Sequence, residues 1–192
     1  MDFHFCLITG PKHSGKSLCA KALHEITGGE LVDLDETIKA QTGKTPRELF
    51  ALGQDIFKKA EAQALSLALQ FNGQKNQRFR IIAAGGGLID NDEAMALLAE
   101  PKTPPREITA VYLDISAETA WQRISAEGEI PPFLNTANPR AAHRELHERR
   151  AEAYKAFASF IVSAENKSPE EIARSLSGFA LFDEENAKKR SF

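Results

Sequence analysis

The sequence predicts an α/β protein built on a five-stranded parallel sheet flanked by helices. Short apolar runs alternate with segments of helical periodicity along the 192 residues, which is the order typical of βαβ units. A glycine-rich motif follows the first apolar run, and polar or glycine-rich residues follow the next two. Because the carboxyl ends of parallel strands meet at one edge of a sheet, we expect these residues to gather where open α/β sheets bind ligands.

The first expected strand, 3–8, leads into a complete G-x-x-x-x-G-K-S phosphate-binding loop at 10–17. The glycines of this loop let backbone N–H groups turn inward around an anion, Lys16 reaches the β- and γ-phosphates, and the Ser17 hydroxyl ligates Mg²⁺. A helix over 14–27 then directs its N-terminal dipole at the phosphates. We therefore expect a nucleotide to contact Gly10, Pro11, Lys12, His13, Ser14, Gly15, Lys16, Ser17 and Leu18.

The second expected strand, 30–34, carries Asp33 and Asp35 at its carboxyl end. Two carboxylates at this edge are suited to a metal ion and to an acceptor hydroxyl. Aspartate also caps helices, so capping of the short helix expected over 36–41 is the alternative. The Thr-Pro-x-Glu pattern that begins at Thr45 predicts a capped helix, and a longer helical pattern follows it.

The third expected strand, 79–84, runs directly into Gly85, Gly86 and Gly87. Three glycines form either an ordinary turn or a place where backbone approaches a ligand closely. A fourth strand is expected around 111–115 and a fifth at 160–163. The remaining helices are expected over 91–100, 117–126, 140–158 and from 168 onward.

Residues 127–139 contain proline, glycine and asparagine and form the longest expected loop, which suggests a lid over an active site. We expect one domain over 1–182, with the polar segment 183–192 as a flexible tail.

The bulk composition excludes several classes of function. Acidic and basic residues number 27 and 24, so a net charge of −3 argues against binding to nucleic acid or an anionic membrane. Two isolated cysteines and the absence of a signal-like N-terminus predict a cytoplasmic protein. His143 and His147 have a spacing that can bind zinc, but no third ligand is evident.

Several features occur in the order and approximate spacing of shikimate kinases, and the likeness covers about residues 4–178. They are the phosphate-binding loop, Asp33 with Asp35, Phe57-Lys58, Gly85 to Gly87, and Arg149-Arg150 with Tyr154. This resemblance implies a monomeric kinase with the P-loop fold of the nucleoside-monophosphate-kinase type. It also implies transfer of the γ-phosphoryl group of MgATP to the 3-hydroxyl of shikimate, a step of aromatic amino-acid biosynthesis.

The resemblance further implies roles for individual residues. Asp35 is the expected catalytic base, with Lys16 on the phosphates and Asp33 beside the magnesium ion that Ser17 ligates. Other residues are expected to bind the acceptor, namely Asp35, Lys58, Gly85, Gly86, Gly87 and Arg150. Arg123 matches the residue that lies against the adenine, so it is expected to bind the nucleotide.

Two departures from the family leave the acceptor open. Lys58 stands where the family usually has an arginine, and lysine lacks the planar fork that grips a carboxylate. The lid has no arginine where the family has one; Arg140 or Arg144 could replace it. The alternatives are therefore a kinase of another small polyhydroxy acid such as gluconate, or a nucleotide-binding relative with little catalysis.

Overall fold

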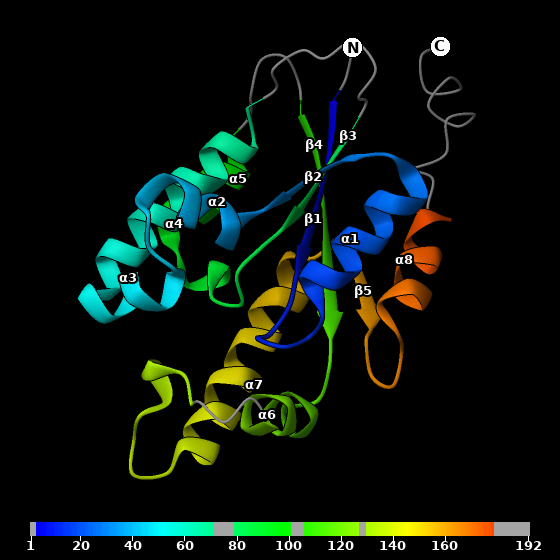
Figure 1. Ribbon diagram of the computed structural model, residues 1–192. Helices are drawn as coiled ribbons and strands as arrows, with labels where there is room; N and C mark the ends of the chain where they lie inside the picture. Colours follow the sequence, from blue (N-terminus) through cyan, green and yellow to red (C-terminus); the bar gives the residue numbers. More distant parts are fainter. Residues whose placement is uncertain (1–2, 71–78, 101–105, 127–129, 179–192) are drawn as a thin grey trace, which may run out of the picture.

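A single parallel sheet forms the centre of the molecule, with strand order β2-β3-β1-β4-β5 (Figure 1). The structure is a computed structural model that describes residues 3–70, 79–100, 106–126 and 130–178. The strands are β1 (Phe3–Thr9), β2 (Glu30–Asp33), β3 (Phe79–Ala83), β4 (Arg106–Asp114) and β5 (Phe160–Ser163). The prediction of a five-stranded parallel sheet is therefore confirmed.

Helices cover both faces of the sheet, as parallel strands require. They are α1 (Lys16–Thr27), α2 (Leu34–Thr42), α3 (Pro46–Leu52), α4 (Gln54–Ala68), α5 (Asp92–Ala99), α6 (Ala117–Ala126), α7 (Pro139–Phe157) and α8 (Pro169–Ser177). Two short 3-10 turns, η1 (Leu88–Asp90) and η2 (Pro132–Leu134), connect them. Among the described residues, no helix is both long and apolar enough to cross a bilayer.

Alternating side chains of the central strands divide the core into two layers. Cys6 and Ile8 of β1 pack with α1 and α8, whereas Phe5 and Leu7 pack with α2, α4 and α5. Figure 1 shows these two groups of helices on opposite sides of β1. This alternation follows from the two-residue period of a strand. The central strand is thus buried on both faces, which fixes the position of the loop that follows it.

Two element boundaries differ from the expectation, each for a physical reason. Strand β4 begins at Arg106 and pairs with β1 from Arg106 to Tyr112, although its polar start hid it from the apolar pattern. Helix α1 begins at Lys16, because Gly15 adopts a left-handed conformation with φ of 92° and belongs to the phosphate-binding loop. The tail expected at 183–192 and the first residues of the lid, 127–129, lie outside the described residues.

Candidate functional site

The phosphate-binding loop has the geometry that its sequence requires. Gly10 has a φ of 150°, and a Cβ there would lie 2.7 Å from the carbonyl oxygen of Leu113, so only glycine fits. Lys16 is 9% exposed, and its ammonium donates a hydrogen bond of 2.7 Å to the Pro11 carbonyl. Burial lowers the pKa of Lys16 to about 8, against the opposing charges of Asp35 and Asp33. The ammonium is held inside the loop, where a phosphate would sit.

Ser17 and Asp33 are brought together across the start of α1 and the end of β2. The Ser17 hydroxyl donates a 2.6 Å hydrogen bond to one oxygen of Asp33. The other oxygen of Asp33 accepts from the backbone N–H groups of Asp35 and Glu36, at 2.9 and 3.4 Å. Asp33 therefore caps α2, as the alternative interpretation expected, and at the same time faces the phosphate-binding loop.

Asp35 is the second residue of α2, two positions after the N-cap Asp33, and faces the triple glycine. A Cβ at Gly85 would lie 3.7 Å from one of its carboxylate oxygens. The surrounding protein desolvates the Asp35 carboxylate and raises its pKa, and the negative charge of Asp33 adds to this rise. The positive charges of Lys16 and Lys12 oppose it. Asp35 is thus a more basic carboxylate than an ordinary surface aspartate, which favours accepting a proton.

The triple glycine allows three elements to meet. A Cβ added at Gly85 would lie 2.8 Å from a carboxylate oxygen of Glu61. A Cβ added at Gly86 would lie 2.9 Å from the backbone nitrogen of Lys12. At Gly87, a Cβ would lie 3.2 Å from a guanidinium nitrogen of Arg150. Residues 86–87 form a turn, and contacts this short mean that a side chain in this segment would displace its neighbours. The close approach of backbone to a ligand at 85–87 stays a prediction.

Glu61 is a buried charged residue that the sequence analysis missed. It is 1% exposed on α4 and accepts a 2.9 Å hydrogen bond from the side-chain amide of Asn91. Burial raises the pKa of Glu61 to about 7. One signal could have found it: Glu61 is four residues after Phe57 and four before Leu65, on the apolar stripe of the helix.

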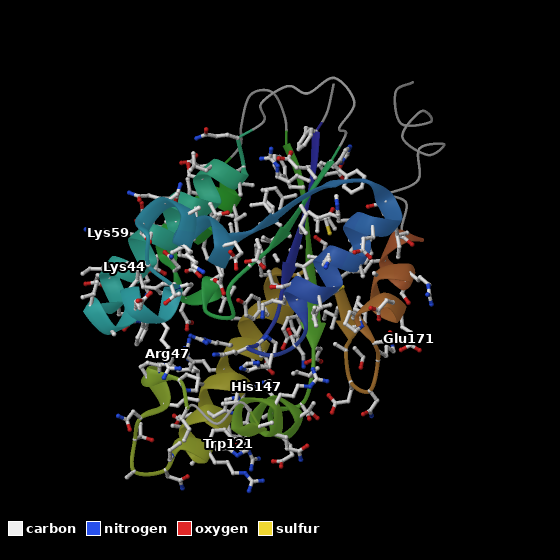
Figure 2. The ribbon with its side chains drawn as sticks, viewed as in Figure 1. Lys44, Arg47, Lys59, Trp121, His147 and Glu171 are labelled. Atoms are coloured by element: carbon white, nitrogen blue, oxygen red, sulfur yellow. The ribbon has the colours of Figure 1, made fainter. Side chains whose placement is uncertain are left out.

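Lys58 and Lys59 are neighbours in the sequence but occupy different environments. Lys58 is half-buried, its charge acts on Glu61, and its backbone carbonyl accepts a 2.8 Å hydrogen bond from Asn91. Lys59 is exposed and lies at the outer surface of the helical layer (Figure 2). Of these two lysines, only Lys58 therefore lies near Glu61, which borders the triple glycine.

Arg150 projects from α7 toward the triple glycine. Its Nε donates a 2.8 Å hydrogen bond to Asp90, and Arg149 donates two more to the same carboxylate at 2.7 and 3.0 Å. The side chain of Arg150 is 20% exposed and that of Arg149 is 58% exposed. Asp90 fixes both guanidinium groups, but only Arg150 is directed inward beside Gly87.

The described part of the lid lies against α3 and α7. The Phe133 ring is 6.0 Å from the Phe50 ring, and the guanidinium carbon of Arg150 is 5.8 Å from the Phe133 ring centre. Arg47 of α3 also lies beside this segment (Figure 2). An aromatic side chain, rather than a charged one, thus covers the inward arginine of α7.

Arg123 and His147 form hydrogen bonds with backbone carbonyl groups around the site. Arg123 donates a 2.9 Å hydrogen bond to the His13 carbonyl, so it braces the phosphate-binding loop, and its contact with adenine stays a prediction. His147 is buried, lies in the interior in Figure 2 and bonds to the Ile115 carbonyl. The described residues contain no group of three or more histidine, cysteine or acidic side chains that could hold a metal.

Comparison with known proteins matches the chain to one family. The family model described as "Shikimate kinase" matches residues 12–179. A shikimate kinase from Lactococcus lactis subsp. lactis is 33% identical over 171 residues, which cover 88% of this chain and 94% of that protein. The family model spans residues 12–17 of the phosphate-binding loop, the triple glycine and α7.

Solved structures show the same fold. The chain resembles a shikimate kinase from Acinetobacter baumannii in complex with shikimate, with a TM-score of 0.75 and 23% identity over 91% of this chain and 90% of that chain. It also resembles a shikimate kinase from Aquifex aeolicus, with a TM-score of 0.68 and 26% identity over 90% of this chain and 93% of that chain. The predicted P-loop kinase architecture is confirmed.

Proposed function

The chain belongs to the shikimate kinase family, and we propose that it transfers the γ-phosphoryl group of MgATP to the 3-hydroxyl of shikimate. One observation carries this proposal. The phosphate-binding loop and the triple glycine touch at Gly86, with Lys16 and Asp35 on the same edge of the sheet. A phosphoryl donor and a hydroxyl acceptor are thereby held next to each other, which is most of what this reaction requires.

The proposed step uses ATP, the acceptor hydroxyl and the side chains of Asp35 and Lys16. The acceptor hydroxyl oxygen forms a bond to the γ-phosphorus, and the bond from that phosphorus to the bridging oxygen breaks. The electron pair leaves on the β-phosphate of ADP, and the hydroxyl proton passes to the Asp35 carboxylate. The raised pKa of Asp35 favours this proton transfer, and Lys16 neutralises charge on the phosphates.

Ser17 and Asp33 fit a magnesium ion that arrives with ATP. A hydroxyl and a carboxylate oxygen already lie 2.6 Å apart beside the phosphate-binding loop. Mg²⁺ is usually held by one or two protein oxygens together with substrate phosphates and water, so this small donor set is sufficient. When bound, the ion neutralises phosphate charge during transfer.

The acceptor carboxylate is proposed to lie between Arg150 and Lys58. Arg150 is held by Asp90 in a fixed orientation, which leaves its terminal nitrogens beside Gly87. Lys58 contributes a point charge from the facing helix α4 and lacks a bidentate fork. We expect this pair to bind a monocarboxylate, with Arg150 setting its direction.

The test is release of ADP from MgATP by the purified protein, measured with shikimate, with gluconate and with no acceptor. Both acids carry one carboxylate and several hydroxyls, so the comparison isolates the shape of the acceptor site. We expect release to depend on shikimate and to stay near the background rate with gluconate. Release driven by gluconate, or by neither acid, would overturn the proposed acceptor.

A further inference from the structure

The lid of this kinase supplies no cation to the transferring phosphoryl group. Residues 127–139 include neither lysine nor arginine. Arg140 and Arg144, just beyond the lid, are bonded to Glu118 and Glu148 at 2.7 and 2.8 Å and are 64% and 75% exposed. Phosphoryl transfer nevertheless develops charge that enzymes neutralise with positive groups. Lys16 and a bound magnesium ion supply positive charge from the donor side, so any further cation comes from a residue outside the lid.

Lys12 lies where the phosphate-binding loop approaches the triple glycine. The Pro11–Lys12 backbone approaches Gly86 so closely that a Cβ there would lie 2.9 Å from the Lys12 nitrogen and 3.3 Å from the Pro11 carbonyl carbon. The Lys12 side chain is exposed, and within the described ranges it forms no ion pair. Its charge is therefore available to a ligand bound at this junction.

The surroundings of Lys12 link it to both substrates. Lys12, Phe133 and Arg150 line the same small cavity between the phosphate-binding loop, the lid and α7. The Lys12 charge also acts on its two catalytic neighbours, because it adds to the lowering of the Lys16 pKa and opposes the rise of the Asp35 pKa. Because the Lys12 backbone approaches the triple glycine and its side chain lines this cavity, its ammonium can reach a phosphoryl group held by the loop.

We propose that Lys12 is a catalytic residue whose ammonium contacts the γ-phosphoryl oxygens and neutralises their charge during transfer, in place of a cation from the lid. This inference rests on the proposed phosphoryl transfer. The lysine takes no part in bond making or proton transfer; it contacts one or two of the equatorial oxygens while the acceptor oxygen attacks. A compact ammonium on a flexible four-carbon stem can follow the phosphorus as it moves.

The test compares Lys12→Gln and Lys12→Arg with Lys59→Gln, which removes an exposed lysine remote from the junction. We expect Lys12→Gln to lower kcat by about 10²- to 10³-fold, the loss typical of one group that stabilises transition-state charge. Lys12→Arg is expected to stay within about tenfold, since the charge is retained. Lys59→Gln should leave kcat unchanged. A Lys12→Gln variant with wild-type kcat would overturn the proposal.

A binding measurement separates this proposal from the identity of the acceptor. MgADP with aluminium fluoride mimics the transferring phosphoryl group and needs no turnover of shikimate. The wild-type protein is expected to bind MgADP more tightly when aluminium fluoride is present, and Lys12→Gln is expected to lose about tenfold or more of that gain. MgADP affinity without fluoride should change less than about threefold. Equal losses in both measurements would mean that Lys12 binds the nucleotide uniformly and is not catalytic.

The two readouts give different results for different failures. If the wild-type protein does not phosphorylate shikimate, the proposed function fails, and the fluoride measurement still decides the role of Lys12. If shikimate is phosphorylated but Lys12→Gln matches the wild type in both measurements, only the role of Lys12 fails. Thermal unfolding of each variant shows whether the fold is intact, which we expect because Lys12 is exposed.

Discussion

The donor and acceptor halves of this site are built in different ways. The donor half is one contiguous loop with the adjoining ends of α1 and β2, in which Lys16 donates to Pro11 and Ser17 donates to Asp33. The acceptor half joins α4, the triple glycine, α7 and the lid, which are far apart in the sequence. It also contains Glu61, a buried carboxylic acid with an oxygen that has no hydrogen-bond partner in the described structure. The donor half is therefore built from neighbours in the sequence, whereas the acceptor half depends on the packing of distant elements.

The largest effect should come from Asp35→Asn, because it removes the base while keeping the shape of the site. We expect acceptor-dependent kcat to fall by about 10³-fold or more, with MgADP affinity unchanged. In the wild-type protein, kcat should fall with decreasing pH through a pKa above the usual aspartate value of about 3.9, because only the deprotonated carboxylate accepts a proton. Stopped assays across pH 4 to 8 measure both effects. Normal turnover by Asp35→Asn would remove Asp35 from the mechanism.

The next effect compares two arginines bonded to the same carboxylate. Arg150→Gln should raise the KM for shikimate by about 10²-fold, because a charge-assisted bond to the acceptor is lost. Arg149→Gln removes the same charge from an exposed position and should change KM by less than about threefold. Initial rates at varied shikimate measure the difference. Similar KM values for the two variants would show that the acceptor carboxylate does not lie beside Arg150.

A third prediction concerns stability in the acceptor half. Burial raises the pKa of Glu61 to about 7, so the folded protein binds a proton that the unfolded chain has released above about 4.3. The free energy of unfolding should therefore fall as pH rises through this window. Glu61→Gln removes that contribution, and its stability relative to the wild type should increase by about 2 to 3 kcal/mol from pH 4.5 to 7.5.

Urea unfolding of the wild type and Glu61→Gln at both pH values measures this change. Glu145→Gln, at an exposed position on α7, is the matched control and should follow the wild type. Parallel stability curves for Glu61→Gln and the wild type would show that Glu61 is charged in the folded protein.

The smallest effect should come from Lys58→Arg, which keeps the charge and adds a planar fork. We expect the KM for shikimate to decrease by about three- to tenfold, because bidentate bonds to a carboxylate are stronger than a point-charge contact. Lys59→Arg provides the control at the outer surface. An increase in KM with Lys58→Arg would indicate that the half-buried site has been shaped for lysine, and hence for a different acceptor.

The same contrast explains how much of the site could be predicted from the sequence. The donor half could be predicted because Gly10 to Ser17 are contiguous and their residue types follow from phosphate chemistry. The triple glycine was also visible. Glu61 was missed, since only its place on the apolar stripe of α4 distinguishes it from an ordinary surface glutamate until packing buries it. The anchoring of Arg149 and Arg150 by Asp90 joins residues about 60 positions apart and carries no local signal.

The fold was predictable to a similar extent and for the same reason. Short-range patterns identified five strands, and the capping boxes at Thr45 and Ser168 marked the starts of two helices. The polar beginning of β4 was missed because its pairing with β1, and not its own composition, makes it a strand. The expectation that Arg140 or Arg144 replaces a lid cation also depended on geometry, and both side chains have glutamate partners at the surface.

Phosphorus NMR shows whether this site joins a phosphoryl donor to the hydroxyl of a carboxylated ring. The purified protein is mixed with MgATP and shikimate, and the products are followed with time. We predict that the γ-phosphate signal of ATP decreases as signals of ADP and of a new phosphomonoester, coupled to a proton of the acceptor ring, increase together. ADP accompanied by inorganic phosphate alone, or an unchanged spectrum, would contradict this prediction.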